Sequence, residues 1–413
     1  QLAEARWQIG EPLSPIDGVP TTLKDTMFAK GWPTLRGSKT TDSDGPWDTD
    51  APPVARLREA GAVFLGKTTT PEFGWKGITD SALSGVTRNP WNTSRTTGGS
   101  SGGAVAAAAL GMGVLHTGTD AGGSVRIPAS FTGVFAIKPT YGRVPAWPAS
   151  PFGTLSHTGP ITRTVRDAAI MLNVMSEPDI RDWTALPPDG RDHLDRIEDG
   201  VKGLRIAYSP TLGHVKFVHP EIADRVDAAA KAFEKLGAVV EQVDPDLADA
   251  ESVFQTHWFA SAAAAAKAVP IEKHFLLDRG LREIMDRGRR VAAADYIDAA
   301  SQRAGIGERM QAFFQDYDLL LTPGQPLPAF AAGIEFPEGY GFTRWHQWTP
   351  FTYPFNLTQQ PAAAVPCGFT ADGLPAGLQL VGPLYQDALV LRGARAYESL
   401  HPFQMPDAPI HGE

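Results

Sequence analysis

The sequence predicts an α/β protein with a mixed, mostly parallel central sheet whose two faces are covered by helices. Helical and strand-like patterns alternate from one end of the chain to the other, which is the order that produces such a sheet. The chain has 413 residues, 42% of them hydrophobic, and this is enough to bury a large core. The alternation contains no internal repeat, and we expect residues 1–413 to form a single domain.

The N-terminal part is predicted to contain two helices and a strand. An amphipathic helical pattern is already under way at Gln1, so we expect a helical segment to precede it. Residues Pro53–Ala60 have helical spacing and stop at Gly61, a residue type that commonly ends helices. The run Ala62–Leu65 is short and apolar, which predicts a buried strand.

The next part of the chain alternates between helices and strands. Ser101–Leu110 consists of small, mostly apolar residues, which predicts a helix packed closely on the sheet. Strands are expected at Val114–Thr117 and Val134–Ile137. Thr164–Val174 is amphipathic and begins at a threonine that can cap a helix.

The second half of the chain begins with a surface connection over Glu177–Gly200, which is rich in proline, aspartate and arginine. Residues 250–315 are helical in pattern almost throughout, and we expect them to form a helical layer over one side of the sheet. The same patterns predict the remaining elements, namely strands at Leu204–Tyr208, Val239–Val243, Leu319–Leu321, Ala362–Val365 and Gly377–Val381, and helices at Pro220–Leu236 and Ala388–Leu400.

Composition excludes several classes of function. Lysine and arginine number 37 against 46 acidic residues, and a net charge of −9 argues against a nucleic-acid partner. The one cysteine, Cys367, allows no internal disulfide and no cysteine-based zinc site, so we expect a cytoplasmic protein without a metal or cofactor. The longest apolar runs, Ala104–Leu110 and Ala260–Ala266, are too short to span a membrane.

Gly61–Thr68 matches the phosphate-loop pattern G-x-x-x-x-G-K-[ST]. In that pattern the residues between the glycines form a loop after a strand. Here they are Ala, Val, Phe and Leu, which are typical of a strand, and Gly61 follows a predicted helix. We therefore expect a strand and no phosphate site.

Gly98–Gly102 matches G-x-S-x-G, the turn that exposes a nucleophilic serine in α/β-hydrolases. Ser100 would then be the nucleophile of an esterase. That mechanism also needs a histidine later in the chain, for which His401 and His411 are the candidates, and neither follows a convincing strand. By itself this motif is ambiguous.

A third motif, Gly118–Ala129, follows a predicted strand and places Ser124 directly after two glycines. Together with Gly98–Gly103 it resembles the core of the amidase signature family, and Lys24, within Gly18–Asp25, lies where that family carries its catalytic lysine. The resemblance covers nearly the whole chain and implies that family's fold. It continues through Gly133–Thr140, Phe355–Thr358, Pro361–Gly368 and Gly373–Gln379.

Amide hydrolysis needs a nucleophile, a proton carrier and hydrogen-bond donors for the developing oxyanion. Ser124 suits the first role. The N–H groups of Ala121, Gly122, Gly123 and Ser124 can point into one small volume, which would form the oxyanion hole. A simple glycine turn is the alternative interpretation of this loop.

The resemblance supplies the proton carrier. It implies a cis peptide bond between Gly99 and Ser100, with Ser100 relaying a proton between Ser124 and Lys24. Without the resemblance, Ser100 would be interpreted as a helix cap, and Lys24 as a surface lysine paired with Asp25.

Three further residues are expected to support the catalytic group. Asp120 and Arg126 flank the glycine loop and should orient it through charge-assisted hydrogen bonds. Ser101 should either cap the following helix or support the relay through Ser100 by a hydrogen bond.

The resemblance implies an amidohydrolase that acts on a small molecule, as a monomer or homodimer. Clustered loop aromatics are more often packed covers than ligand contacts, but a pocket lined by them would favour apolar or aryl amides, anilides or carbamates. His346 and Cys367 are expected to be structural. The aromatics concerned are Trp147, Phe152, Trp345, Trp348 and Phe351.

Besides the esterase that would use Ser100, two alternatives to an amidohydrolase stay open at this point. The amide-handling component of a tRNA-dependent amidotransferase is less favoured, because such chains commonly have Gln where this chain has Ile127, and because the chain lacks a basic stripe. A scaffold without activity would be expected to have lost Lys24, Ser100 or Ser124, and all three are present.

Overall fold

A ten-stranded mixed sheet forms the centre of the molecule in the computed structural model, which describes residues 1–406. The strand order is β11-β10-β12-β14-β13-β8-β9-β7-β1-β2. The strands, in chain order, are β1 (Pro20–Lys24), β2 (Val63–Thr68), β7 (Leu115–Asp120), β8 (Phe135–Lys138), β9 (His157–Thr162), β10 (Arg205–Tyr208), β11 (Val239–Gln242), β12 (Leu319–Pro323), β13 (Ala362–Phe369) and β14 (Pro375–Val381).

Parallel strands lie at both ends of the sheet and antiparallel strands in its middle. At one end β1 pairs in parallel with both β2 and β7, and at the other β10 pairs in parallel with β11 and β12. Between them, β14, β13, β8 and β9 pair antiparallel with their neighbours. The mixed sheet predicted from the alternating patterns is confirmed.

Helices cover both faces of the sheet, also as predicted. On one face of the sheet, buried hydrophobic side chains form a continuous core. Four helices contribute to it, namely α2 (Pro52–Glu59), α5 (Val165–Met175), α6 (Pro220–Lys235) and α11 (Asp387–Glu398). Thr164 caps α5 by accepting a hydrogen bond from the Asp167 N–H, which confirms the expected start of that helix.

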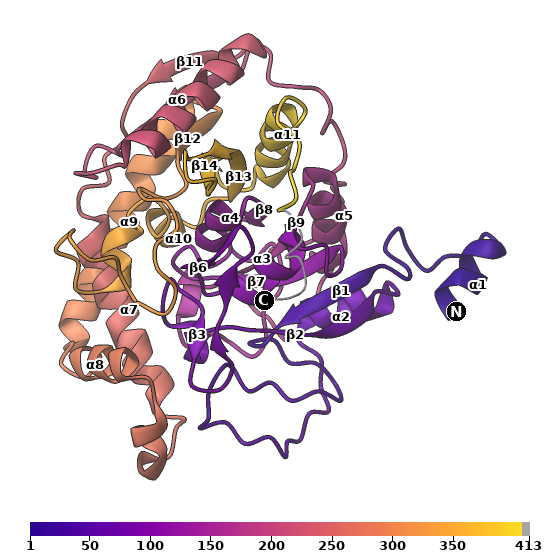
Figure 1. Ribbon diagram of the computed structural model, residues 1–413, viewed down its shortest axis with the longest axis vertical. Coiled ribbons are helices and arrows are strands. Elements are labelled where there is room, and N and C mark those ends of the chain that lie inside the picture. The colour runs from indigo at the N-terminus through magenta and orange to yellow at the C-terminus, as the bar shows by residue number, and fades with distance from the viewer. Residues whose placement is uncertain (407–413) are drawn as a thin grey trace.

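The opposite face carries two short buried helices and the helical layer. Helices α3 (Gly102–Ala109) and α4 (Arg126–Thr132) pack against the sheet and against each other. Helices α7 (Ala250–Ala266), α8 (Arg279–Gly288) and α9 (Ala293–Asp316) lie together along one side of the molecule, beside α10 (Pro354–Leu357) (Figure 1). The predicted layer over residues 250–315 is therefore present as separate helices.

The structure corrects one element and adds others. The expected buried strand at Ala62–Leu65 is β2, which is not buried: it is the edge strand, and Val63 and Leu65 expose 46% and 54% of their surface. The strands β1 and β9 and the helix α4 were not predicted. Helix α1 (Leu2–Gln8) opens the chain, and two hairpins, β3 (Asp80–Ser81) with β4 (Gly85–Val86) and β5 (Arg88–Asn89) with β6 (Asn92–Thr96), lie outside the main sheet.

None of the helices within residues 1–406 combines the length and the apolar character needed to cross a membrane.

Candidate active site

The parallel strands β1 and β7 end at the same edge of the sheet, and their last residues begin the site. Lys24 is the last residue of β1, and Asp120 is the last residue of β7. The two strands are also joined by the Lys24 N–H, which donates to Thr117 Oγ1 at 2.9 Å. Residues that follow parallel strands commonly form the ligand site of an α/β protein, and the glycine loop after Asp120 lies there.

Lys24 is completely buried and surrounded by hydroxyl groups. Its Nζ donates to Ser100 Oγ at 2.7 Å, and to Ser101 Oγ and Thr119 Oγ1 at 2.9 Å each. Burial lowers the pKa of Lys24 to about 7, although the negative charge of Asp120 opposes that shift. Lys24 is therefore not the surface lysine paired with Asp25 that the isolated sequence would favour.

Thr119 is a contact of Lys24 that the sequence did not single out. It lies inside the glycine motif between Gly118 and Asp120. Its position near the end of β7, just before the loop that carries Ser124, was the available signal. Alternate side chains of a β-strand point to the same face, so one of the last residues of β7 was bound to face the site.

Ser100 lies in the turn that precedes α3. The peptide bond between Gly99 and Ser100 is cis. The residue at the cap position of α3 is Ser101, and its hydroxyl accepts from Lys24 instead of capping the helix. Of the two roles expected for Ser101, the structure shows a contact with the lysine.

Ser124 faces the same pocket as Ser100 and is 4% exposed. Its carbonyl oxygen accepts from the Ser101 N–H at 3.1 Å, which ties the glycine loop to the start of α3. Within the described residues its hydroxyl makes no hydrogen bond, neither to Ser100 nor to another group. The Oγ is therefore open to the pocket.

The backbone of the glycine loop presents different N–H groups to different partners. The Gly123 N–H donates to Asp120 Oδ1 at 2.7 Å, so it is already engaged. No acceptor among residues 1–406 is paired with the N–H of Ala121, Gly122 or Ser124. Gly123 has a φ of +124°, a conformation that L side chains rarely adopt, which explains the glycine there.

A buried ion pair holds this loop in place. Arg126 donates to Asp120 through Nε at 3.0 Å and through Nη2 at 2.9 Å, and neither side chain is exposed. The same guanidinium reaches Gln379 and Asn356, and Asn356 also donates to Asp120. Arg126 lowers the pKa of Asp120 well below its usual range, against the effect of burial, so the carboxylate stays ionised.

The pocket above Ser124 has a volume of about 440 Å³ and is mostly apolar. Trp147 and Phe152 line it, whereas Trp345, Trp348 and Phe351 are buried in the core beneath. Among the described residues that line it, Arg36 is the one charged side chain. The others are Thr26, Met27, Ala51, Pro53, Phe73, Gly74, Ser100, Thr119, Ala121, Ser124, Ala146, Pro148, Ala149, Ser150, Pro151, Ser156, Thr158, Ala264, Ala265 and Ala268.

The competing motifs do not form sites. The residues between Gly61 and Thr68 form β2, as expected, and not a phosphate loop. His401 is exposed, stacks on Tyr397 and does not line the pocket of Ser100, and His411 lies outside the described residues.

His346 and Cys367 are both buried away from the pocket. Burial raises the pKa of the Cys367 thiol to about 12, which keeps it unreactive.

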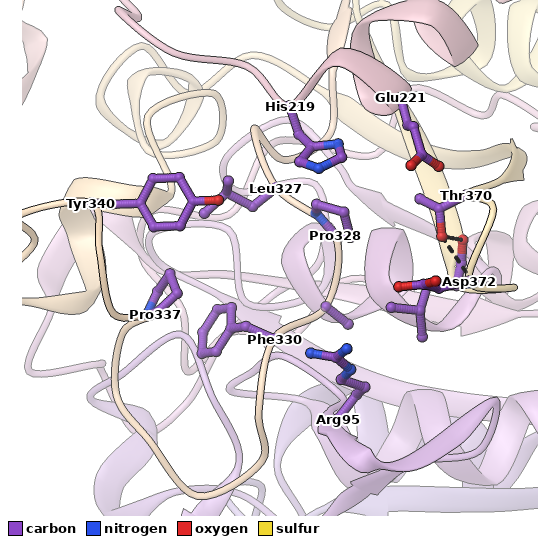
Figure 2. A pocket seen from close by; sticks show the side chains of 12 residues that line it. Arg95, His219, Glu221, Leu327, Pro328, Phe330, Pro337, Tyr340, Thr370 and Asp372 are labelled. Atoms are coloured by element: carbon purple, nitrogen blue, oxygen red, sulfur yellow. Dashed lines mark hydrogen bonds between the residues drawn. The ribbon is translucent and has the colours of Figure 1, made fainter.

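A second hollow lies elsewhere on the surface, lined by charged and apolar side chains (Figure 2). Figure 2 shows Arg95 and His219 on opposite sides of the hollow. Glu221 and Asp372 lie along a third side, between them. None of the candidate catalytic residues lines this hollow.

Comparisons with known proteins agree on one family. The family model described as Amidase matches residues 1–391. An acylamidase of Rhodococcus erythropolis is 40% identical over 404 residues, which cover 96% of this chain and 84% of the relative. A glutamyl-tRNA(Gln) amidotransferase chain of Myxococcus xanthus is 35% identical over 99% of this chain and 89% of its own length.

A solved structure of a bacterial aryl acylamidase, an amidase signature enzyme, has the same fold. It superposes with a TM-score of 0.89 at 31% identity, covering 97% of this chain and 86% of its own.

Proposed function

Because the chain belongs to the amidase family and is an amidase, we propose that it cleaves amide bonds through an acyl-enzyme on Ser124. In this proposal Ser100 and Lys24 carry the proton. The observation that supports it most is the buried Lys24, whose Nζ lies 2.7 Å from Ser100 Oγ, at the edge of the pocket where the Ser124 hydroxyl is open. A lysine whose pKa is near 7 is in part neutral at neutral pH and can accept a proton.

Acylation begins with a proton transfer. Lys24 takes the proton of the Ser100 hydroxyl while Ser100 takes that of Ser124, and Ser124 Oγ bonds to the substrate carbonyl carbon. The free N–H groups of the glycine loop, on Ala121, Gly122 and Ser124, stabilise the resulting oxyanion. The Gly123 N–H, which was also expected among these donors, is not one of them, because it already donates to Asp120.

Breakdown of this intermediate returns the proton. The C–N bond breaks, and the proton held on Lys24 passes through Ser100 to the leaving nitrogen, which departs as an amine. Water then attacks the acyl carbon of the Ser124 ester and gives one proton to Ser100 and Lys24. The bond between that carbon and Ser124 Oγ breaks, the proton returns through Ser100 to Ser124 Oγ, and the acid product leaves. The Asp120–Arg126 pair stays charged throughout and fixes the loop.

The lining of the pocket supports a proposal for the substrate class. Trp147 and Phe152 line it, and its other walls are mainly alanine and proline, so apolar or aryl amides and carbamates fit best. We propose a small-molecule substrate for this reason. The cytoplasmic location and the monomeric or homodimeric state stay predictions.

Transamidation is the second candidate, favoured by the 35% identity to the glutamyl-tRNA(Gln) amidotransferase chain. Glutamine, as amide donor, would bring an α-ammonium group into the pocket. Among the described residues that line it, no side chain is acidic, so that ammonium would lack a partner. Ammonia release from glutamine that exceeded the hydrolysis of an anilide would favour this second candidate.

The test of the proposal is the replacement Ser124→Ala. We expect it to lower kcat/KM for a 4-nitroanilide by several orders of magnitude, because no acyl-enzyme can form. Labelling with a fluorophosphonate probe, followed by mass spectrometry, should modify Ser124 in the wild type and nothing in the variant. Ser301→Ala, on the exposed side of α9, is the control.

The outcome separates the two serine hypotheses. An active, labelled Ser124→Ala protein together with an inactive Ser100→Ala protein would overturn the proposal in favour of the esterase turn at Gly98–Gly102. Normal activity in both variants would show that neither serine is the nucleophile.

A further inference from the structure

Arg36 places a single positive charge in the wall of an otherwise uncharged pocket. It shares this pocket with Ser124 and Ser100. Among the described residues no side chain or carbonyl accepts a hydrogen bond from its guanidinium, and none of its nitrogens is sealed from the pocket and solvent. The half-buried guanidinium therefore has N–H groups that are free of protein acceptors and can donate to a ligand in the pocket.

The position of the guanidinium is fixed by its neighbours. It stacks over the Phe28 ring at 5.4 Å, and Phe28 packs edge-on against Trp147, which also lines the pocket. Stacking occupies the flat face of a guanidinium and leaves the N–H groups on its edge free to bind a ligand.

The carboxylate whose charge acts on Arg36, that of Asp25, is committed to other partners. Its carboxylate accepts from the Leu35 and Gly37 N–H groups, and it lies 3.7 Å from Lys67 Nζ. Asp25 thus holds the turn that carries Arg36 without pairing with its guanidinium. Two cationic side chains, Arg36 and Lys67, face this one carboxylate, so the cluster has an excess of positive charge.

The backbone at Arg36 is also strained. Its φ is +56°, in the left-handed region that glycine and asparagine adopt more easily. Phe73, which also lines the pocket, has a φ of +52°, and its N–H donates to the Arg36 carbonyl. Strained residues of this kind cluster at ligand sites, where the side chain is needed in one place.

We propose that Arg36 binds a carboxylate of the substrate, so that this amidase prefers amides that carry a free carboxylate away from the scissile bond. The guanidinium would hold the carboxylate with charge-assisted hydrogen bonds. This inference rests on the proposed function, since it names the substrate class for the pocket of Ser124.

The test compares matched substrates. Glutaric acid mono-4-nitroanilide and its uncharged carboxamide place the group on the acyl side. The pair 4-acetamidobenzoate and 4-acetamidobenzamide places it on the amine side. In at least one pair we expect wild-type kcat/KM to be higher for the carboxylate by about tenfold or more, the effect of a hydrogen bond to a charged group.

Arg36→Asn should bring that ratio close to one, and Arg36→Lys should retain part of it. Asparagine tolerates the left-handed conformation, so this variant removes the charge without adding strain. Arg196→Asn is the matched control, because Arg196 has a φ of +59° but lies exposed and away from the pocket. It should leave both rates and their ratio unchanged.

Two failures can be told apart. If the neutral anilide is hydrolysed by Ser124 but neither carboxylate is preferred, or if Arg36→Asn leaves the preference intact, the inference is wrong and the proposed function stands. If no amide is hydrolysed, the proposed function fails. In that case the affinity of the same carboxylates is measured by calorimetry on the Ser124→Ala protein, with and without Arg36→Asn. Equal affinities in the two proteins would overturn the inference that Arg36 binds a carboxylate.

Discussion

At the scale of single residues, the proposed mechanism requires that Lys24 be kept out of water. A lysine in water is a cation at neutral pH and cannot accept a proton. Complete burial at the end of β1 brings its pKa to about 7, and Ser100, Ser101 and Thr119 provide acceptors that keep the amine oriented. Asp120 limits the shift, and it is itself neutralised by Arg126.

The first prediction concerns pH. Since the pKa of Lys24 is lowered from 10.5 to about 7, the neutral base increases as pH rises through that value. We expect kcat/KM for a neutral anilide to rise with a midpoint near pH 7 and then to level off. The rate of fluorophosphonate labelling, which needs acylation alone, should follow the same curve. The range from about pH 5.5 to 9 extends well to both sides of that midpoint. If kcat/KM and the labelling rate stayed constant over this range, the proposed role of Lys24 would be contradicted.

Some of these residues could be predicted from the sequence and others could not. Ser124 could be proposed as the nucleophile because its loop has the glycines that an oxyanion site needs, whereas the role proposed for Lys24 came from resemblance; both roles stay predictions. Burial of Lys24 depends on β7 and α3, which are distant in sequence. Arg36 could not be singled out from the sequence either, because the pocket that it lines is assembled from several separate segments.

At the scale of elements, close packing of α3 holds Ser100 and Ser101 beside Lys24, as the proposed proton relay requires. The helix begins at Gly102, directly after Ser100 and Ser101. Gly102 lies against the side chains of Thr79 and Thr97, whereas Gly103 lies against the backbone of Thr69. A Cβ added at Gly103 would clash with the backbone nitrogen of Thr69. The absence of side chains therefore lets the start of the helix approach the sheet region that carries Lys24.

The second prediction is that Gly103→Ala lowers both stability and activity. Backbone cannot move aside as a flexible side chain can, so we expect a loss of about 1–3 kcal/mol in the free energy of unfolding. The displaced start of α3 should also lower kcat/KM. Urea denaturation and anilide hydrolysis measure the two effects.

Gly307→Ala is the matched control for this substitution. Gly307 lies in the helix α9 with nothing within 4 Å of its added Cβ. Replacing it should stabilise the protein by about 0.5–1 kcal/mol, because alanine loses less conformational freedom than glycine. Equal stability changes in the two variants would show that α3 is not constrained as described.

The elements missed from sequence share physical causes. Strand β9 contains Gly159 and Pro160, which are typical of turns, and α4 has seven residues with Pro128 inside it, too short for helical periodicity. The central strand β8 and the long helix α6 were predicted because their apolar patterns are continuous. Strand order determines that β2 lies at the edge of the sheet and is not buried. The pattern of residues within a strand does not predict that order.

At the scale of the whole molecule, the pocket forms where the sheet meets the helical layer. Its floor is the edge with Ser124 and Ser100, one wall is the loop with Trp147 and Phe152, and another is Ala264, Ala265 and Ala268 at the end of α7. In Figure 1, α7 and its neighbours lie along the side of the sheet and not over its centre. That the chain is one domain stays a prediction, although this pocket needs residues from both halves.

The small side chains at the end of α7 leave room for a bulky group in the pocket that Ser124 lines. We therefore predict that the wild type prefers a 4-nitroanilide to acetamide, and that Ala264→Phe reduces this preference severalfold by filling the space. The ratio of the two kcat/KM values, from nitroaniline and ammonia release, is the measurement. Since Ala264 is exposed at the pocket wall, the added ring occupies open volume and should leave stability almost unchanged.

Ala304→Phe tests whether position matters. Ala304 is also an exposed helical alanine, but it lies on α9 and does not line the pocket. The added ring there should leave the anilide-to-acetamide ratio at its wild-type value. If both variants altered the ratio equally, or if acetamide were the better substrate of the wild type, the pocket wall on α7 would not determine which amides reach Ser124.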